Sequence, residues 1–307
     1  MTAKVLLTEI ITFLGDNIVE CFGFKEDFYL SGIASQGSSS QELIDWVHHK
    51  NPQPQEHAEK SLSRLIICPS SVEYSADMKA KSKVVICLKD PYCAIAMIGN
   101  RFFVERTPPG IHLSAIISDN TIVGKNVRIG ANAVLDGCIV GDDCIIGDHV
   151  IIRNSVHIGD RATIKSGAIL GETGFGFVHD DSGGLIRFPQ IGRLLIGNNV
   201  EIGSHTCIDR GSFSDTIIED NVKINNLCHI AHNVRIGSST IITAHVNISG
   251  STSIGSKVWI GPNATFVGHH KIGNRAMIGA GANVVCDVPS NEVWVGNPAR
   301  FLRKNDK

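Results

Sequence analysis

Residues 224–241, INNLCHIAHNVRIGSSTI, repeat one pattern three times in 18 residues and decide the fold. Ile224, Ile230 and Ile236 are spaced by six, and a small or β-branched residue lies two positions before each of them. The same aliphatic slot continues from 218 to 284, and an upstream run keeps the period from 117 to 170 with a single five-residue step after Leu135. Two interruptions fall at about 172–191 and around 210–214. The chain therefore contains a long six-residue repeat.

A period of six fits neither the helical period of 3.6 nor a long strand, but it fits short strands joined by tight corners. Three hexads make one triangular coil, and stacked coils share parallel ladders about 4.8 Å apart. We therefore predict a mainly β protein built around a parallel β-helix, with the aliphatic slot pointing inward. Cys138, Cys144 and Cys228 occupy the small slot of the repeat and are expected to be core residues.

The residues before the repeat have a different pattern. LLTEIITFLGD is an amphipathic helix candidate, and RLIICPSSV and KVVICLKD are candidate buried strands. ERTPPG then interrupts the chain before the repeats begin. The predicted organisation is a small α+β domain at 1–110, a β-helix at 111–296 and a C-terminal tail at 297–307.

Composition excludes several classes of function. The 28 basic and 30 acidic residues give a net charge of −2, without the basic field that nucleic acid requires. No run approaches the roughly 18 consecutive apolar residues of a membrane-spanning helix, and MTAKVLLTEI does not read as a signal peptide. We expect a cytoplasmic protein with neither a transmembrane segment nor a nucleic-acid partner.

The coil length places a histidine beside a column of glycines. Residues 232, 250 and 268 fall at equivalent corners of successive coils, and they are His232, Gly250 and Gly268, with His269 adjacent. A neutral imidazole is suited to act as a general base, and exposed backbone N–H groups can hold an oxyanion. The alternative is that His232 is an ordinary solvated corner residue, as we expect for the histidines without such company: His205, His229, His245 and His270.

Two further interpretations concern the surroundings of His232. The coil arithmetic separates His232 from His269 by about 10 Å, too far to share a zinc ion, so we expect no metal. Asp215 lies roughly one coil from His232 and would orient the imidazole, unless it is an ordinary turn carboxylate.

Several motifs resemble those of a known enzyme family. IGETGFGF, FPQIGRLLIGNNVEIGSHTCIDRG, SDTIIEDNVKINNLCHIAHNVRIG and VGHHKIG are similar to signatures of the lipid A biosynthetic UDP-3-O-acylglucosamine N-acyltransferase (LpxD) family. LSGIASQGSSSQELIDW and VVICLKDPYCAIAMI resemble its nucleotide-binding domain. The resemblance implies a left-handed β-helix, a homotrimer with active sites between subunits, and no permanently bound cofactor.

The resemblance also implies roles for individual residues. His232 would be the general base, His269 the second histidine, and Gly250 the oxyanion donor. The substrate, a nucleotide-linked amino sugar, would contact Trp46, Asn233, Gly268 and Phe175. Trp46 lies near the family's base-stacking aromatic, but Pro52 stands about where the family has a downstream tyrosine, so the nucleotide base stays open.

The C-terminal end instead resembles hexapeptide acetyltransferases that use coenzyme A, through GAGANVVCDVPSNEVWVGNPARFLRK. Donor binding is accordingly assigned to Ala280, Arg300, Arg303 and Lys304. The preferred hypothesis is an N-acyltransferase that uses a short acyl-CoA. The alternatives are a lipid A N-acyltransferase that takes a long 3-hydroxyacyl chain from acyl carrier protein, and a β-helical scaffold without catalysis.

Overall fold

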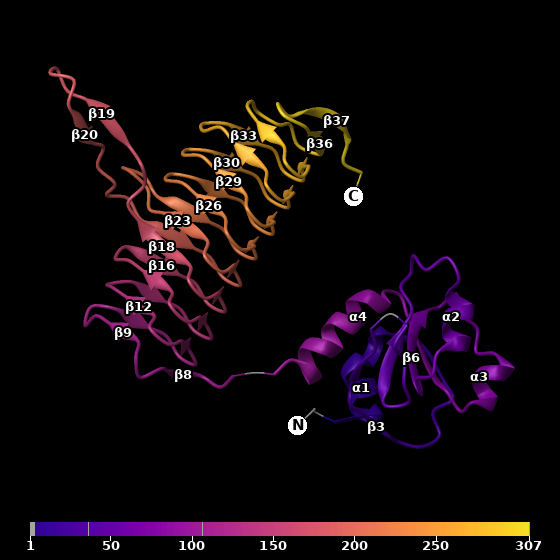
Figure 1. Cartoon of the computed structure of the whole chain (residues 1–307). Coiled ribbons are helices and arrows are strands. Elements are labelled where there is room, and N and C mark those ends of the chain that lie inside the picture. The colour runs from indigo at the N-terminus through magenta and orange to yellow at the C-terminus, as the bar shows by residue number, and fades with distance from the viewer. Residues whose placement is uncertain (1–3, 36, 106, 307) are drawn as a thin grey trace. The chain divides into compact units, whose positions relative to one another are not determined.

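The computed structural model describes residues 4–35, 37–105 and 107–306. The chain forms two compact units, Met1–Thr107 and Pro108–Lys307. Figure 1 shows the first as a small sheet with helices and the second as a stack of triangular coils.

The first unit is built on a five-stranded sheet in the order β2-β7-β6-β5-β4, in which β4 to β7 are parallel and β2 is antiparallel. Its strands are β1 (Val5–Leu6), β2 (Ile18–Phe22), β3 (Tyr29–Leu30), β4 (Gly32–Ile33), β5 (Leu43–Trp46), β6 (Leu65–Pro69) and β7 (Val84–Leu88). Its helices are α1 (Leu7–Leu14), α2 (Pro54–Lys60), α3 (Ala76–Ala80) and α4 (Pro91–Ile98), with a 3-10 turn at Gly15–Asn17 and a π-helical turn at Gly99–Phe103. The predicted helix and both predicted strands are confirmed as α1, β6 and β7.

The second unit consists of three parallel sheets, one for each side of the prism. The first contains β10 (Ile122–Val123), β13 (Ile139–Val140), β16 (Val156–Ile158), β21 (Leu194–Ile196), β24 (Thr216–Ile218), β27 (Arg235–Ile236), β30 (Ser253–Ile254) and β33 (Lys271–Ile272). The second contains β9 (Ile116–Ile117), β12 (Val134–Leu135), β15 (Ile151–Ile152), β18 (Ile169–Glu172), β23 (Cys207–Asp209), β26 (His229–Ile230), β29 (Asn247–Ile248), β32 (Thr265–Phe266) and β35 (Asn283–Val284). The third contains β8 (Gly110–Ile111), β11 (Arg128–Ile129), β14 (Ile145–Ile146), β17 (Thr163–Ile164), β22 (Glu201–Ile202), β25 (Lys223–Ile224), β28 (Ile241–Ile242), β31 (Trp259–Ile260), β34 (Met277–Ile278), β36 (Glu292–Val295) and β37 (Arg300–Lys304), the last antiparallel to β36.

The aliphatic slot of the repeat fills the interior of the prism, as predicted. Every member of the column from Ile218 to Val284 is at most 3% exposed, and it forms one continuous core with the small slot. Cys138, Cys144 and Cys228 lie in this core, so their predicted role is confirmed. The predicted 18-residue coil is seen in the register, where Ile230 pairs with Ile248 and Ile248 with Phe266.

The corners explain why the repeat tolerates so many polar residues. One residue in most corners has a positive φ, and the slot recurs every six residues at Leu227, Asn233, Ser239, His245 and Ser251. Asparagine and histidine are enriched in this left-handed region of backbone space. Histidines such as His205 and His245 therefore occupy corner positions for which the backbone conformation gives a structural reason.

The two interruptions of the repeat are additions to the coils. The longer one carries an antiparallel hairpin of β19 (Phe177–His179) and β20 (Leu185–Arg187), which projects from the β-helix in Figure 1. The shorter one, around residues 210–214, lengthens one coil so that Ile196 pairs with Ile218. The five-residue step is also seen, because Ile122 pairs with Ile139.

The expected C-terminal tail at 297–307 is largely ordered as strand β37. This segment folds back on β36, with Val295 paired to Arg300 and Glu292 paired to Lys304. The exposed edge of β36 gives the returning chain backbone partners, which a count of hexads does not register. Within the described residues, no helix has the length and apolar character needed to cross a membrane.

Candidate active site

The predicted stack of His232, Gly250 and Gly268 is present. The backbone N–H of Ser251 donates to His232 O at 3.0 Å, and that of His269 donates to Gly250 O at 3.1 Å, so the three corners follow one another. A Cβ added to Gly250 would lie 2.7 Å from His232 Cε1 and 2.9 Å from Nε2. Only glycine leaves room for the imidazole at this position, because real Cβ atoms do not approach so closely.

Asn233 sets the orientation of the His232 ring. Its Nδ2 donates to the carbonyl oxygen of Ser214 at 2.8 Å, which fixes the amide so that Oδ1 faces His232. His232 Nδ1 is 2.9 Å from that oxygen. Since an amide oxygen only accepts, Nδ1 carries the proton and donates it, which leaves the lone pair on Nε2. The residue adjacent to His232 thus selects the tautomer that a general base requires.

The short interruption supplies a second contact to the same ring nitrogen. Ser212 Oγ lies 3.4 Å from His232 Nδ1 and donates to Gln190 Oε1 at 3.0 Å, and its backbone N–H donates to Asn233 Oδ1 at 3.2 Å. Ser212 and Gln190 are both buried. Two irregular segments of the chain therefore converge on His232 and hold its ring in place.

A carboxylate and a second histidine lie beside the site. A Cβ on Gly174 would be 3.1 Å from His232 Cδ2 and 3.2 Å from Asp209 Oδ2, so the segment leading into the hairpin passes over both residues. Asp209 Oδ2 is 3.3 Å from His229 Nε2. This hydrogen bond raises the pKa of His229 above its usual value, against the opposing effect of burial. His229, expected to be an ordinary surface histidine, thus belongs to a buried-carboxylate pair.

Asp215 does not orient His232. Its carboxylate accepts from Arg193, at 2.9 Å from the backbone N–H and 2.7 Å from Nη2. These contacts lower the pKa of Asp215. Our expectation that Asp215 orients His232 is not met, because the extra residues of the interruption direct it to Arg193 and present Ser212 and Asn233 to the imidazole instead.

The other expected substrate contacts are dispersed. His269 occupies the positive-φ corner position next to Gly268 and is exposed. Phe175 lies at the base of the hairpin, 85% exposed, with its ring 5.1 Å from that of Phe177. Trp46 lies in the first unit, at the end of β5.

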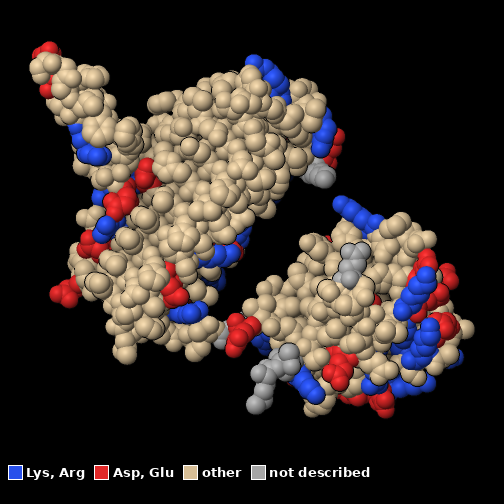
Figure 2. Space-filling view, in the orientation of Figure 1, with Lys and Arg blue, Asp and Glu red and all other residues tan. Residues whose placement is uncertain are grey.

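The expected donor-binding residues lie in the last coils, where Figure 2 shows Lys and Arg side chains gathered at the end that holds β33 to β37. Ala280 is an exposed corner residue. Lys304 Nζ is 2.6 Å from Glu292 Oε1, and this contact lowers the pKa of Glu292. Arg300 and Arg303 each donate to a backbone carbonyl, of Ala299 and Lys304 respectively. All three basic side chains therefore already have partners within the chain.

The residues missed from the sequence are Asp209, Ser212 and Gln190. Each lies in or beside an interruption of the repeat, where the hexad count gives no position in space. The only sequence signal was that polar residues gather where the period fails. Within the described residues, no group of three His, Cys, Asp or Glu side chains is placed to hold a metal ion.

Comparison with known proteins bears on the β-helix. Residues 137–172, 215–250 and 251–285 match the family described as bacterial transferase hexapeptide (six repeats). A solved structure of LpxA from Acinetobacter baumannii is similar to this chain, with a TM-score of 0.59 and 27% identity over 64% of this chain and 74% of that one. A UDP-N-acetylglucosamine O-acyltransferase from Moraxella catarrhalis gives a TM-score of 0.59 and 25% identity, covering 64% and 75%. The predicted fold class, a left-handed parallel β-helix of hexapeptide repeats, is confirmed.

The second unit thus places the protein in the class of hexapeptide-repeat β-helices. Within that class the chain is similar to UDP-3-O-acylglucosamine N-acyltransferases. It is 43% identical over 147 residues to the one from Caulobacter sp. (strain K31), which is 48% of this chain and 43% of that protein. For the one from Methylobacterium nodulans the values are 44%, 48% and 42%. The match spans less than half the length of these relatives, and over that span the chain is LpxD-like.

Proposed function

We propose that this protein is an N-acyltransferase that moves an acyl group from a thioester to the amine of a nucleotide-linked amino sugar. The observation that carries the proposal is His232, held with Nε2 unprotonated by Asn233 and lying directly over Gly250. Over the β-helix the chain is similar to UDP-3-O-acylglucosamine N-acyltransferases, whose name describes this reaction type. A structural scaffold would need neither the selected tautomer nor the glycine beneath it.

The geometry fits each step of acyl transfer. The sugar amine attacks the thioester carbonyl, and the carbon–nitrogen bond forms as the carbonyl oxygen becomes an oxyanion. Gly250 N–H makes no hydrogen bond within the part of the chain that the structure describes, so it is available to the oxyanion. His232 Nε2 takes the proton from the nitrogen, and the tetrahedral intermediate expels the thiolate. The imidazolium then returns the proton to the sulfur.

The donor is better described by our alternative than by our preferred short acyl-CoA. The relatives act on an acylglucosamine, as their name states, and the three basic residues assigned to coenzyme A phosphates have partners within the chain. Val267 and Val285 stack on each other past the corner of Gly250, and both are exposed. We propose that a long acyl chain, delivered as an acyl carrier protein thioester, lies along this apolar edge.

The complete site is proposed to form between subunits of a homotrimer. A broad uncharged area extends along the face of the β-helix seen in Figure 2. The first coils expose large apolar side chains at Ile116, Ile122, Ile139 and Ile145. Exposed apolar surface of this kind is typical of a face that packs against another subunit.

A donor series tests the proposal. Purified protein is assayed with UDP-linked 3-O-acylglucosamine and with acetyl, hydroxybutyryl and hydroxymyristoyl groups, each on acyl carrier protein and on coenzyme A. We expect kcat/KM to rise steeply with chain length, since each additional buried methylene contributes about 0.8 kcal/mol. Equal rates for all chain lengths would restore the short-donor hypothesis, and no transfer from any donor would support the scaffold alternative.

A further inference from the structure

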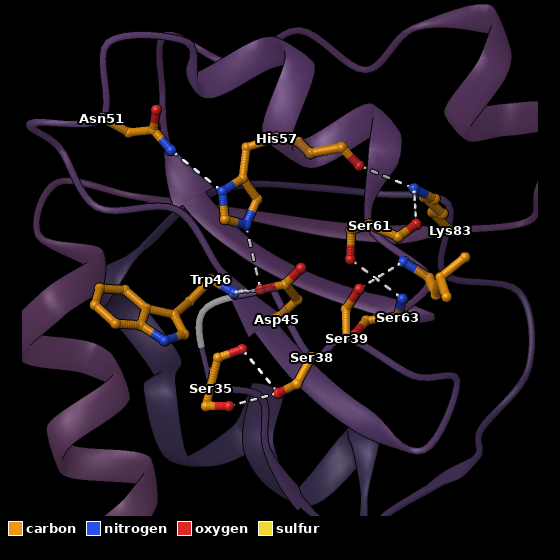
Figure 3. Close-up of polar contacts among 12 residues, drawn as sticks. Ser35, Ser38, Ser39, Asp45, Trp46, Asn51, His57, Ser61, Ser63 and Lys83 are labelled. Atoms are coloured by element: carbon orange, nitrogen blue, oxygen red, sulfur yellow. Dashed lines mark hydrogen bonds and ion pairs between the residues drawn. The ribbon is translucent and has the colours of Figure 1, made fainter.

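The first unit contains a cavity that no step of acyl transfer uses. It has a volume of about 270 Å³ and is lined by Ala34, Asp45, Trp46, His48, Asn51 and His57. Figure 3 shows the polar contacts around it, with Asp45, His57 and Asn51 joined by a line of hydrogen bonds.

Asp45 is a buried carboxylate in the wall of this cavity. It lies near the end of β5 and is 6% exposed. Its Oδ1 accepts from the backbone N–H of Trp46 at 2.8 Å and contacts His57 Nε2 at 3.3 Å. A buried carboxylate is costly unless hydrogen bonds compensate for the lost water. Both compensating contacts reach the same oxygen.

The protonation of His57 follows from Asn51. The backbone N–H of Gln53 donates to Asn51 Oδ1 at 2.9 Å, which fixes the orientation of the amide. Asn51 Nδ2 therefore faces His57 Nδ1, 3.2 Å away, and donates to it. Because Nδ1 accepts, the ring proton is on Nε2 and points at Asp45. The chain of contacts holds Asp45 as an ionised acceptor.

One oxygen of Asp45 is left over. Within residues 4–35, 37–105 and 107–306, no donor is hydrogen-bonded to Oδ2. A ligand in the cavity satisfies it only by presenting an N–H or O–H donor. The carboxylate would repel a group that offers a lone pair at the same place.

The aromatic wall narrows the choice of ligand. The rings of Trp46 and Tyr92 have centroids 5.7 Å apart, and that of His48 is 6.0 Å from Trp46. Tyr92 comes from α4, so the fold brings a tyrosine beside Trp46 although the sequence has none at the expected downstream position. Indole and phenol faces stack on planar heterocycles.

We propose that this cavity holds the base of the nucleotide and that Asp45 determines which base is accepted, by taking a ring N–H in Oδ2. Uracil and guanine carry a ring N–H at their pairing edge, and cytosine and adenine carry a lone pair there. The inference rests on the proposed nucleotide-linked substrate and adds to it the residue that reads the base.

Calorimetric titration of the full chain tests this with matched ligands. Uridine, guanosine and cytidine monophosphates are compared with N3-methyluridine monophosphate, which keeps the uracil ring and loses only the N–H. We expect the uridine or the guanosine ligand to bind, which separates the two candidate bases, and the cytidine ligand to bind at least about 10-fold more weakly, as loss of a hydrogen bond to a charged group implies. If uridine monophosphate binds, methylation should weaken it by at least the same factor.

Two variants assign the discrimination to Asp45. In Asp45→Asn, the difference between accepted and rejected ligands should fall to within about 3-fold, because the amide offers a donor as well as an acceptor. Asp77→Asn, which alters an exposed carboxylate of the same unit, should leave it unchanged. Equal binding of all four ligands to the parent protein, binding of none, or full discrimination in Asp45→Asn would overturn the proposal. The assay measures no acyl transfer, so its failure is distinct from failure of the proposed reaction.

Discussion

At the scale of single residues, the neutral partner of His232 is the informative feature. A carboxylate next to an imidazole stabilises its charged form, whereas the oxygen of Asn233 fixes the tautomer without a full negative charge. His229 is the contrasting case, since Asp209 raises its pKa. Two histidines three positions apart are thus given different electrostatic surroundings.

We expect His232→Ala to lower kcat by about two to four orders of magnitude, the usual contribution of a general base. The fold should survive, because His232 lies at a corner outside the buried column. Steady-state kinetics with circular dichroism check both points. The control is His245→Asn, which changes a histidine at another corner to a residue that tolerates positive φ. Parental turnover in His232→Ala would remove this residue from the mechanism.

The His229–Asp209 pair should show in a pH titration. Because the pKa of His229 is raised in the folded protein, its stabilising effect is present below the ordinary value of 6.5 and is lost as pH rises through the folded value. NMR of the imidazole should place the midpoint above 6.5 in the parent and closer to 6.5 in Asp209→Asn. The Tm difference between the two proteins should shrink at alkaline pH. A midpoint that Asp209→Asn leaves unmoved would contradict the pair.

At the scale of elements, two-residue strands are stable only because each aliphatic side chain is sealed between coils. Ile248 is fully buried, between Ile230 and Phe266 in the ladder. The corners bear no such constraint and are free to carry polar side chains. The repeat thus separates stability, inside, from chemistry, at the corners.

Ile248→Asp should prevent folding of the β-helix. It buries an unpaired charge in the continuous core, at a cost of several kcal/mol, which is comparable to the whole stability of a domain. Soluble expression and thermal unfolding by circular dichroism measure the effect. Thr265→Asp places the same charge on the outside of neighbouring strand β32 and should unfold like the parent. Cooperative, parental unfolding of Ile248→Asp would disprove the inward position of this slot.

At the scale of the whole molecule, sedimentation equilibrium at micromolar concentration should give about three times the chain mass of 33.0 kDa. The exposed isoleucines of the first coils are the expected contact, so Ile122→Glu should shift the distribution toward the monomer by introducing a charge into an apolar interface. Val19→Glu, a change at an exposed apolar residue of the first unit, serves as the control. A monomeric parent protein would exclude the trimer.

The sequence by itself determined the β-helix, its inward column and the stacking of His232 over Gly250, because an 18-residue coil converts a position in the chain directly into a position in space. The tertiary structure alone decided what surrounds that corner. Ser212, Gln190 and Asp209 come from segments where the period fails, and the coil arithmetic wrongly pointed to Asp215, which bonds Arg193. The Asp45 pocket likewise joins β5, α2 and the segment between them through hydrogen bonds that have no period. Periodic burial can be read along a chain, whereas an irregular polar network depends on distances that only the folded structure sets.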